Sequence, residues 1–139
     1  MIALDTHILA RFYVDDPNDP EAAKQRPMAF GIFTESDRLF VPLTVVLELE
    51  GVLRAFYGFS TDDFARVITH LLGLANVRVE DWGKINDALV WHTQGLEFAD
   101  ALHLVASSGC ETFLSFDDRR FARCAVRLKT QPTVKVPAA

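Results

Sequence analysis

The sequence has little cysteine and no long apolar run, and both shortages narrow the kind of protein it encodes. Cys110 and Cys124 are the only cysteines in 139 residues, and their spacing is not that of a zinc site. We therefore expect free, buried thiols rather than a disulfide or zinc framework. No segment reaches the roughly 18 consecutive apolar residues that cross a bilayer, and no secretory signal is visible. These absences predict a soluble cytoplasmic protein without membrane association.

Basic charge is scarce as well, because the net charge is −5 at pH 7. A phosphate backbone is usually met by a basic surface, so this balance argues at first against a nucleic-acid partner. The charge is unevenly distributed, however, since residues 119–139 carry +6 and the preceding 118 residues carry −11. That asymmetry has two interpretations: an acidic metal pocket beside a phosphate-binding strip, or a solvated helix face and tail.

Short apolar runs alternate with helical periodicity along the chain. Strands are predicted at 1–4, 38–42, 77–79 and 112–114, of which the first two are expected to be buried, with edge strands at 126–128 and 133–136. Helices are predicted at 8–14, 21–36, 45–57, 61–75, 82–94, 98–108 and 119–125. This alternation favours an α/β fold with a mostly parallel central sheet covered by helices on both faces. Half of the residues are apolar, which is enough for one domain over residues 1–139.

Polar residues mark the expected starts of three helices. Thr44 is expected to cap the helix at 45–57, and Asp81 is expected to cap the helix at 82–94. Ser60 is expected to begin the helix at 61–75, which has acids in its first turn. The buried face of the helix at 45–57 is predicted from apolar residues spaced by three and four positions, namely Val45, Leu49, Val52, Leu53 and Phe56.

Four carboxylates lie among apolar neighbours and form the candidate site. Asp5 follows the first strand, Glu48 and Asp100 lie within helices, and Asp117 follows the strand at 112–114. Burying several ionised carboxylates requires a compensating cation. Oxygen ligands suit Mg²⁺ or Mn²⁺, whereas zinc more often takes His and Cys. Parallel sheets bind ligands at the carboxyl ends of their strands, where Asp5 and Asp117 are expected.

Each of these carboxylates also has a plain structural explanation. Asp5 can cap the helix that follows it, and Asp100 can interact with the dipole in the first turn of its helix. Glu48 can face solvent, as can Glu50 two residues later, and Asp117 can be a loop residue. The sequence alone leaves both interpretations open, because convergence of the four depends on the fold.

Four segments resemble, in order and spacing, the acidic motifs of PIN domains. They are LDTHIL at 4–9, VLEL at 46–49, FADALHLVAS at 98–107, and LSFD at 114–117 with Phe121. The resemblance is closest to the VapC-type toxins of bacterial toxin–antitoxin pairs and covers essentially the whole chain. It implies a three-layer α/β/α domain that binds Mg²⁺ or Mn²⁺ and hydrolyses RNA to leave a 5′-phosphate. One departure is His7, where many members have Asn.

The resemblance also implies roles for individual residues. Asp5, Glu48, Asp100 and Asp117 match the acidic residues that bind metal and carry catalysis. Thr6 and Ser115 match polar residues that commonly lie beside the metal.

His103 lies three residues after Asp100 on the same helical face. It is either a general base or a hydrogen-bonded supporting residue. We favour the supporting role, because a metal lowers the pKa of its own bound water and makes a histidine base unnecessary. Arg119, Arg120 and Arg123 are interpreted as contacts for flanking phosphates of the RNA.

Partners are implied by the same resemblance, which suggests a cognate antitoxin and a homodimer. An aromatic excess near the helices at 8–14 and 45–57 predicts an apolar contact surface there. Its members are Phe12, Tyr13, Phe56, Tyr57 and Phe59.

Two other functions compete with RNA cleavage. A metal-dependent phosphatase with Asp5 as nucleophile would need a second Asp two residues later, where this chain has His7. A non-catalytic protein-binding module would keep the fold alone, and the intact set of four acids argues against it.

Overall fold

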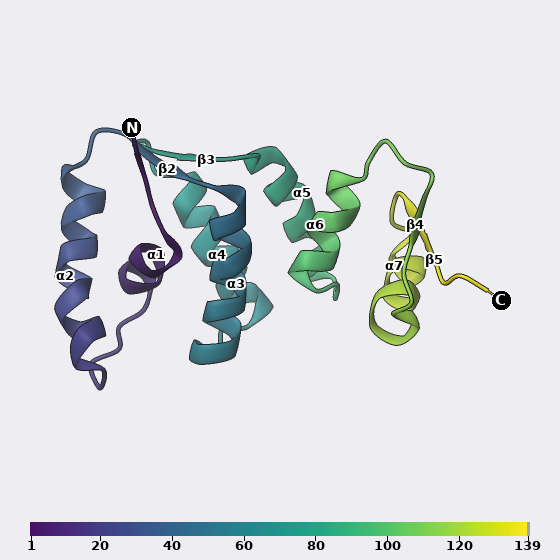
Figure 1. The fold of residues 1–139 in the computed structure, drawn as a ribbon, viewed down its shortest axis with the longest axis horizontal. Coiled ribbons are helices and arrows are strands. Elements are labelled where there is room, and N and C mark those ends of the chain that lie inside the picture. Colours follow the sequence, from purple (N-terminus) through teal and green to yellow (C-terminus); the bar gives the residue numbers. More distant parts are fainter. Residues whose placement is uncertain (139) are drawn as a thin grey trace. The chain divides into compact units, whose positions relative to one another are not determined.

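The computed structural model describes residues 1–138, which form two compact units. The first unit is Met1–Glu80, and the second begins at Asp81. Each unit combines helices with strands that pair in parallel (Figure 1). The parallel sheets flanked by helices confirm the predicted α/β class.

The first unit has a three-stranded parallel sheet in the order β1-β2-β3. Its strands are β1 (Ile2–Ala3), β2 (Leu39–Val41) and β3 (Val77–Val79). Its helices are α1 (Thr6–Tyr13), α2 (Pro20–Glu35), α3 (Leu43–Tyr57) and α4 (Thr61–Leu72). Helices α1 and α2 connect β1 to β2, and α3 and α4 connect β2 to β3, as parallel pairing requires.

The first strand is less buried than its apolar sequence suggests. Ile2 is 57% exposed, whereas Leu4 is buried. The prediction of a buried strand is therefore wrong for Ile2 and Ala3, which lie on an edge strand that pairs only with β2 within its sheet. The amide of Leu4 still donates to the Phe40 carbonyl at 2.9 Å. This bond extends the pairing and fixes the position at which the chain turns at Asp5.

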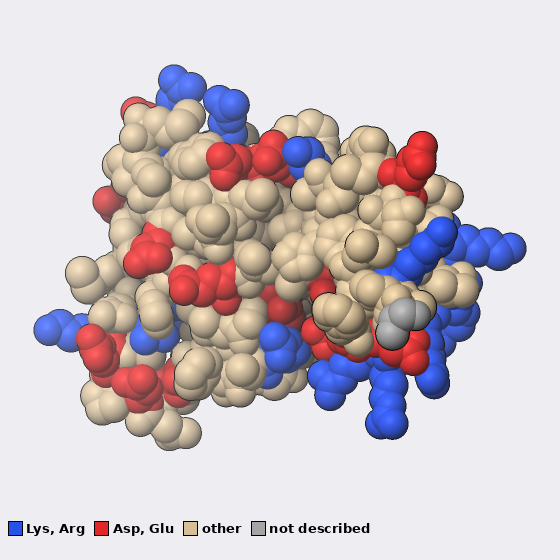
Figure 2. Space-filling view, turned by 45° about the vertical axis from the view of Figure 1, so that its right-hand side comes forward, with Lys and Arg blue, Asp and Glu red and all other residues tan. Residues whose placement is uncertain are grey.

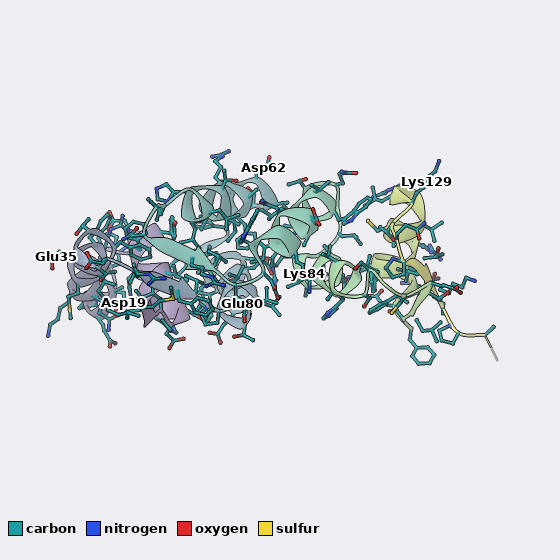
Figure 3. The ribbon with its side chains drawn as sticks, turned by 90° about the horizontal axis from the view of Figure 1, so that it is seen from above. Asp19, Glu35, Asp62, Glu80, Lys84 and Lys129 are labelled. Carbon is teal, nitrogen blue, oxygen red and sulfur yellow. The ribbon has the colours of Figure 1, made fainter. Side chains whose placement is uncertain are left out.

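Helix α3 begins without the cap that its sequence predicts. Thr44 is not the N-cap, because the helix starts at Leu43, after Pro42, with no capping side chain in its own segment. Instead, Glu80, which follows β3, accepts a hydrogen bond from the Leu43 amide at 2.8 Å (Figure 3). The carboxylate that satisfies the helix terminus is thus 37 residues away in sequence, where no local signal reveals it.

The buried face of α3 is rotated from the predicted one. Val46, Leu49 and Leu53 are fully buried, and Glu50 is buried beside them. Phe56 is 80% exposed, so its assignment to the buried face is wrong. The three- and four-residue spacing is satisfied equally by a face that starts at Val46, and packing against α1 selects that face.

Part of the aromatic excess packs between the helices of this unit. The Phe12 ring of α1 stacks on Phe33 of α2 with centroids 4.0 Å apart, and it lies 4.9 Å from Phe30. The hydroxyl of Tyr13 lies 2.9 Å from Nδ1 of His70 on α4, and burial raises the pKa of this phenol. Phe12 and Tyr13 therefore join helices α1, α2 and α4 instead of forming a free surface.

The second unit pairs two helices with a two-stranded parallel sheet. Helices α5 (Trp82–Thr93) and α6 (Phe98–Ala106) pack together, and β4 (Thr112–Leu114) pairs with β5 (Thr133–Lys135). Between the strands lie a turn of π-helix, η1 (Asp118–Ala122), and α7 (Arg123–Leu128). The expected edge strand at 126–128 is wrong, because these residues continue the helix that buries Cys124 and Ala125.

Asp81 stands at the N-cap of α5 as predicted, but in the left-handed conformation and without a side-chain cap bond. Cys110 is exposed and Cys124 is buried, and both thiols are free. The expectation of free thiols is confirmed, and that of a buried Cys110 is wrong. Within residues 1–138, no helix has the length and apolar character that crossing a membrane requires.

Candidate active site

Asp5 lies at the carboxyl end of β1, where the strand turns into α1. Its backbone is extended, with φ −85° and ψ 165°, and its Oδ1 accepts a hydrogen bond from the Thr6 amide at 2.8 Å. The capping role that the sequence left open is therefore present. The residue is nevertheless exposed, so the carboxylate is accessible to a cation while it caps the helix.

Thr6 connects Asp5 to Glu48. Its side chain is fully buried, and its hydroxyl donates to Oε1 of Glu48 on α3. One residue thus donates to two of the predicted acids, from its amide to Asp5 and from its hydroxyl to Glu48. The first unit brings these two carboxylates together at the start of α1.

Glu50 is separated from this pair by the geometry of the helix. It is buried and accepts a hydrogen bond from Arg54 Nε at 2.9 Å, whereas Glu48 is exposed. Two residues along a helix point in different directions, and Glu50 accordingly points away from Glu48 and is buried where the sequence left it open to solvent. Its role is to pair with Arg54 along α3.

Asp100 lies in the first turn of α6, in the second unit, and is half-buried. Its pKa is raised, first by loss of solvation and then by the negative charge of Glu97, with a further contribution from Asp117. The positive charge of His103 opposes these effects. Asp100 and Asp117 therefore lie near enough for their negative charges to repel each other.

Asp117 is held in place by its own loop. It caps η1, with Oδ1 accepting from the Arg120 amide at 3.0 Å. Its own amide donates to Oγ of Ser115 at 3.0 Å, so Ser115 fixes the backbone that carries the carboxylate. Like Asp5, Asp117 follows a parallel strand, is exposed and binds the first turn of a helix.

His103 stacks on an aromatic ring. Its imidazole lies 6.3 Å from the centroid of Phe113, with the planes 11° apart. Within residues 1–138 the ring makes no hydrogen bond, so the hydrogen-bonded support that we favoured is not observed. Its charge favours the ionised form of Asp100, which is an electrostatic supporting role.

With this geometry in hand, comparison with known proteins gives one clear result. The PIN domain family matches residues 2–126. The chain belongs to this family. PIN domains are generally nucleases that depend on divalent metal ions, and the match runs through both compact units. A search of the curated proteins found no match.

The carboxylates of this PIN domain have the chemistry that a divalent cation needs. Asp5 and Asp117 are exposed, and each binds a backbone amide through Oδ1. Hard oxygen donors of this kind suit Mg²⁺ or Mn²⁺. Within the described chain, no three Asp, Glu, His or Cys side chains already stand in a geometry that holds a metal. The carboxylate oxygens match the preference of Mg²⁺ or Mn²⁺ for oxygen ligands.

Sequence reasoning missed two features of this PIN domain. Glu97 lies beside Asp100 and raises its pKa, and its position three residues earlier was the available signal. The bond from the Thr6 hydroxyl to Glu48 joins residues 42 positions apart. No local pattern predicts that contact, although Thr6 was expected near the metal from the family motif.

Proposed function

We propose that this PIN domain is a metal-dependent endoribonuclease and the toxin of a toxin–antitoxin pair. The observation that carries the proposal is that every acidic position of the family motifs holds a carboxylate here, within a match over residues 2–126. These residues are Asp5, Glu48, Asp100 and Asp117. The contact of Thr6 with both Asp5 and Glu48 supports a built site in the first unit.

The proposed chemistry is hydrolysis of a phosphodiester bond in RNA. A bound Mg²⁺ or Mn²⁺ would polarise the attacking water and the scissile phosphate. Asp5, Asp100 and Asp117 would hold the cation, and Glu48, oriented by Thr6, would complete or orient the cluster. Water attacks phosphorus and the bond to the 3′ oxygen breaks, which leaves a 5′-phosphate and a 3′-hydroxyl. His103 would act on the charge of Asp100 rather than as the base.

Both compact units are needed for this proposal, because each supplies two of the acids. We propose that they make up a single PIN domain over residues 1–139. This shared role of the acids rests on the family match, which begins in the first unit and ends in the second.

An antitoxin and a second copy of the chain are the proposed protein partners. Phe56 near the end of α3 and Met28 on α2 are exposed apolar side chains of the first unit. Such side chains commonly mark contact surfaces. Light scattering is expected to show a dimer, and a strict monomer at high concentration would contradict self-association.

RNA cleavage with and without metal tests the proposed activity. Labelled RNA incubated with the wild type is expected to be cut in Mg²⁺ or Mn²⁺, to remain intact in EDTA, and to give fragments with 5′-phosphates. Asp100→Asn is expected to abolish cleavage, because it removes one ligand charge. Asp87→Asn on the exposed face of α5 is the matched control and should cut normally.

If Asp100→Asn cleaved RNA at the wild-type rate at a controlled metal concentration, the proposed mechanism would be contradicted. A wild type that binds RNA but never cuts it in either metal would favour the non-catalytic binding module instead.

A further inference from the structure

Phe116 is the most exposed large apolar side chain in residues 1–138. It is 85% exposed and lies between Ser115 and Asp117, directly beside a proposed catalytic acid. A phenyl ring left in water forgoes the stabilisation that burial would give it, and its faces are open to a ligand. The main-chain and side-chain bonds around it show that the exposure is not that of a loose loop.

Hydrogen bonds hold the backbone on both sides of Phe116. The Ser115 amide donates to the Lys135 carbonyl on β5, and the Asp117 amide donates to Ser115 Oγ, each at 3.0 Å. The carbonyl of Phe116 itself accepts from the Asp118 amide at 3.0 Å. An aromatic ring with two torsions on a fixed backbone loses little conformational entropy when a ligand stacks on it.

Basic residues are concentrated in the part of the second unit that follows this ring, from Arg119 onward. Figure 2 shows Lys and Arg side chains clustered on the surface of the second unit. The side chains of three exposed residues make no ion pair or hydrogen bond within residues 1–138, namely Arg119, Lys129 and Lys135. Lys129 lies at the C-terminal end of α7 (Figure 3).

Two further arginines of this cluster are held only by exposed ion pairs. Arg120 lies 3.5 Å from Glu97, and Arg123 lies 3.2 Å from Asp118. Exposed pairs of this kind contribute little and exchange readily for a phosphate. Arg127 differs, because its guanidinium donates to Cys124 Sγ at 3.5 Å and lies against Gly95, so we exclude it from the phosphate-binding set.

We propose that Phe116 stacks on an unpaired base of the RNA substrate while Arg119 binds an adjacent phosphate. An aromatic ring three residues before an unpaired arginine fits single-stranded RNA, whose bases splay out and stack on such rings. A duplex offers phosphates but keeps its bases stacked. Phe116 would therefore select unpaired segments next to Asp117. The inference rests on the proposed ribonuclease function, from which it can be separated by experiment.

Binding is measured in EDTA, where RNA is not cut, by fluorescence anisotropy on the full chain. The probes are a short labelled single-stranded RNA of mixed sequence and the blunt-ended duplex that it forms with its complement. Phe116→Ala is expected to weaken binding of the single strand by about fivefold or more, and to leave duplex binding unchanged. Phe116→Tyr is expected to restore binding because it retains the ring.

Salt dependence separates stacking from charge. Arg119→Ala is expected to lower the slope of log affinity against log salt by about 0.7, the value for one phosphate contact with a single strand. Phe116→Ala should leave that slope unchanged. Trp82→Ala is the matched control, since Trp82 is also an exposed aromatic of the second unit, at 61%, but has Asp81 as its neighbour.

Four results would overturn the inference. The first three are that Phe116→Ala binds single-stranded RNA with wild-type affinity, that Phe116→Leu restores this affinity in full, or that Trp82→Ala lowers it as much as Phe116→Ala does. The fourth is that Phe116→Ala changes the oligomeric state of the protein without changing its affinity for RNA. The last would assign Phe116 to a protein contact. If Phe116→Ala bound single strands weakly while the wild type cut no RNA in Mg²⁺, the ribonuclease proposal would fail and the stacking role would stand.

Discussion

At the scale of single residues, Thr6 is the side chain on which the geometry of the first acidic pair depends. Thr6 is fully buried, its amide donates a hydrogen bond to Asp5, and its hydroxyl donates one to Glu48. The bond to Asp5 comes from the backbone, so a substitution at Thr6 leaves it in place. The bond to Glu48 comes from the hydroxyl and is lost when the hydroxyl is removed. The two contributions can therefore be separated by mutation.

Thr6→Val is expected to weaken Mn²⁺ binding and RNA cleavage by about 10- to 100-fold, the usual effect of removing a partner that orients a metal ligand. Unfolding free energy should change by only about 1 kcal/mol, because valine fills the same space and exposed Glu48 is solvated by water. Thr6→Ser keeps the hydroxyl and should restore both readouts. Unchanged Mn²⁺ affinity in Thr6→Val, measured by titration, would show that the hydroxyl does not position Glu48.

Asp100 is the residue at which stability and function are expected to diverge. Its folded-state pKa is raised by desolvation and by the charges of Glu97 and Asp117. The protonated form is therefore favoured in the folded protein. Protonated Asp100 makes its full contribution to the free energy of unfolding at pH values below its unfolded-state pKa. This contribution is lost as the pH rises through the raised folded-state pKa. Without metal, this residue should make the wild type less stable as pH rises through that mildly acidic window.

Asp100→Asn is expected to be inactive yet at least as stable as the wild type in EDTA at neutral pH. The two proteins should melt alike at acidic pH, where Asp100 is protonated and resembles asparagine. Millimolar Mg²⁺ should narrow or reverse the order, because a ligand bound by the native state stabilises the wild type more. Thermal melting across pH, in EDTA and in Mg²⁺, measures this. A variant that melts far below the wild type in EDTA would identify Asp100 as a structural residue.

At the scale of elements, helix α4 shows how far local signals define a boundary. The Ser60 hydroxyl accepts from the Asp63 amide at 3.1 Å, and the Asp63 carboxylate accepts from the Ser60 amide at 2.9 Å. This capping box is the start that the sequence predicts. The hydrogen bond from the Ser60 amide has the largest effect on the pKa of Asp63 and lowers it. The hydrogen bond with the Ser60 side chain lowers this pKa further.

Ser60→Ala is expected to destabilise the protein by about 1 kcal/mol, the usual cost of losing an N-cap. A lowered folded pKa contributes stability above the unfolded pKa, and that contribution is lost as pH falls through the folded value. Asp63→Asn should therefore be less stable than the wild type at neutral pH, and the difference should disappear at strongly acidic pH. Melting curves of both variants check this, and equal midpoints at neutral pH would contradict it.

Elements whose signals are local were predictable, and elements that depend on distant contacts were not. The α2 helix and the strands β2, β3 and β4 follow from apolar runs and turn residues near their ends. The start of α3 does not, because its cap is Glu80, which is remote in sequence. Residues 126–128 have strand-like apolar character, yet they continue the helical turn that begins at η1.

At the scale of the whole molecule, the members of the candidate site are a prediction from the sequence, and their contacts come from the structure. The four acids were recognised from their apolar neighbours and from the family motifs. The bond between Thr6 and Glu48 and the effect of Glu97 on Asp100 require the folded chain. The uneven charge in the sequence left two interpretations open, a phosphate-binding strip or a solvated helix face and tail. Only the structure shows that Phe116 is exposed and that Phe12 stacks on Phe33.

Mn²⁺ binding tests most directly the central proposal, that Asp5 and Asp117 both serve as ligands of a divalent cation. Electron paramagnetic resonance titration should show a Mn²⁺ site in the wild type that both Asp5→Asn and Asp117→Asn weaken about tenfold or more. Glu35→Gln, at an exposed acid of α2, is the control and should bind normally. Wild-type Mn²⁺ affinity in either aspartate variant, or no site in the wild type, would contradict the claim.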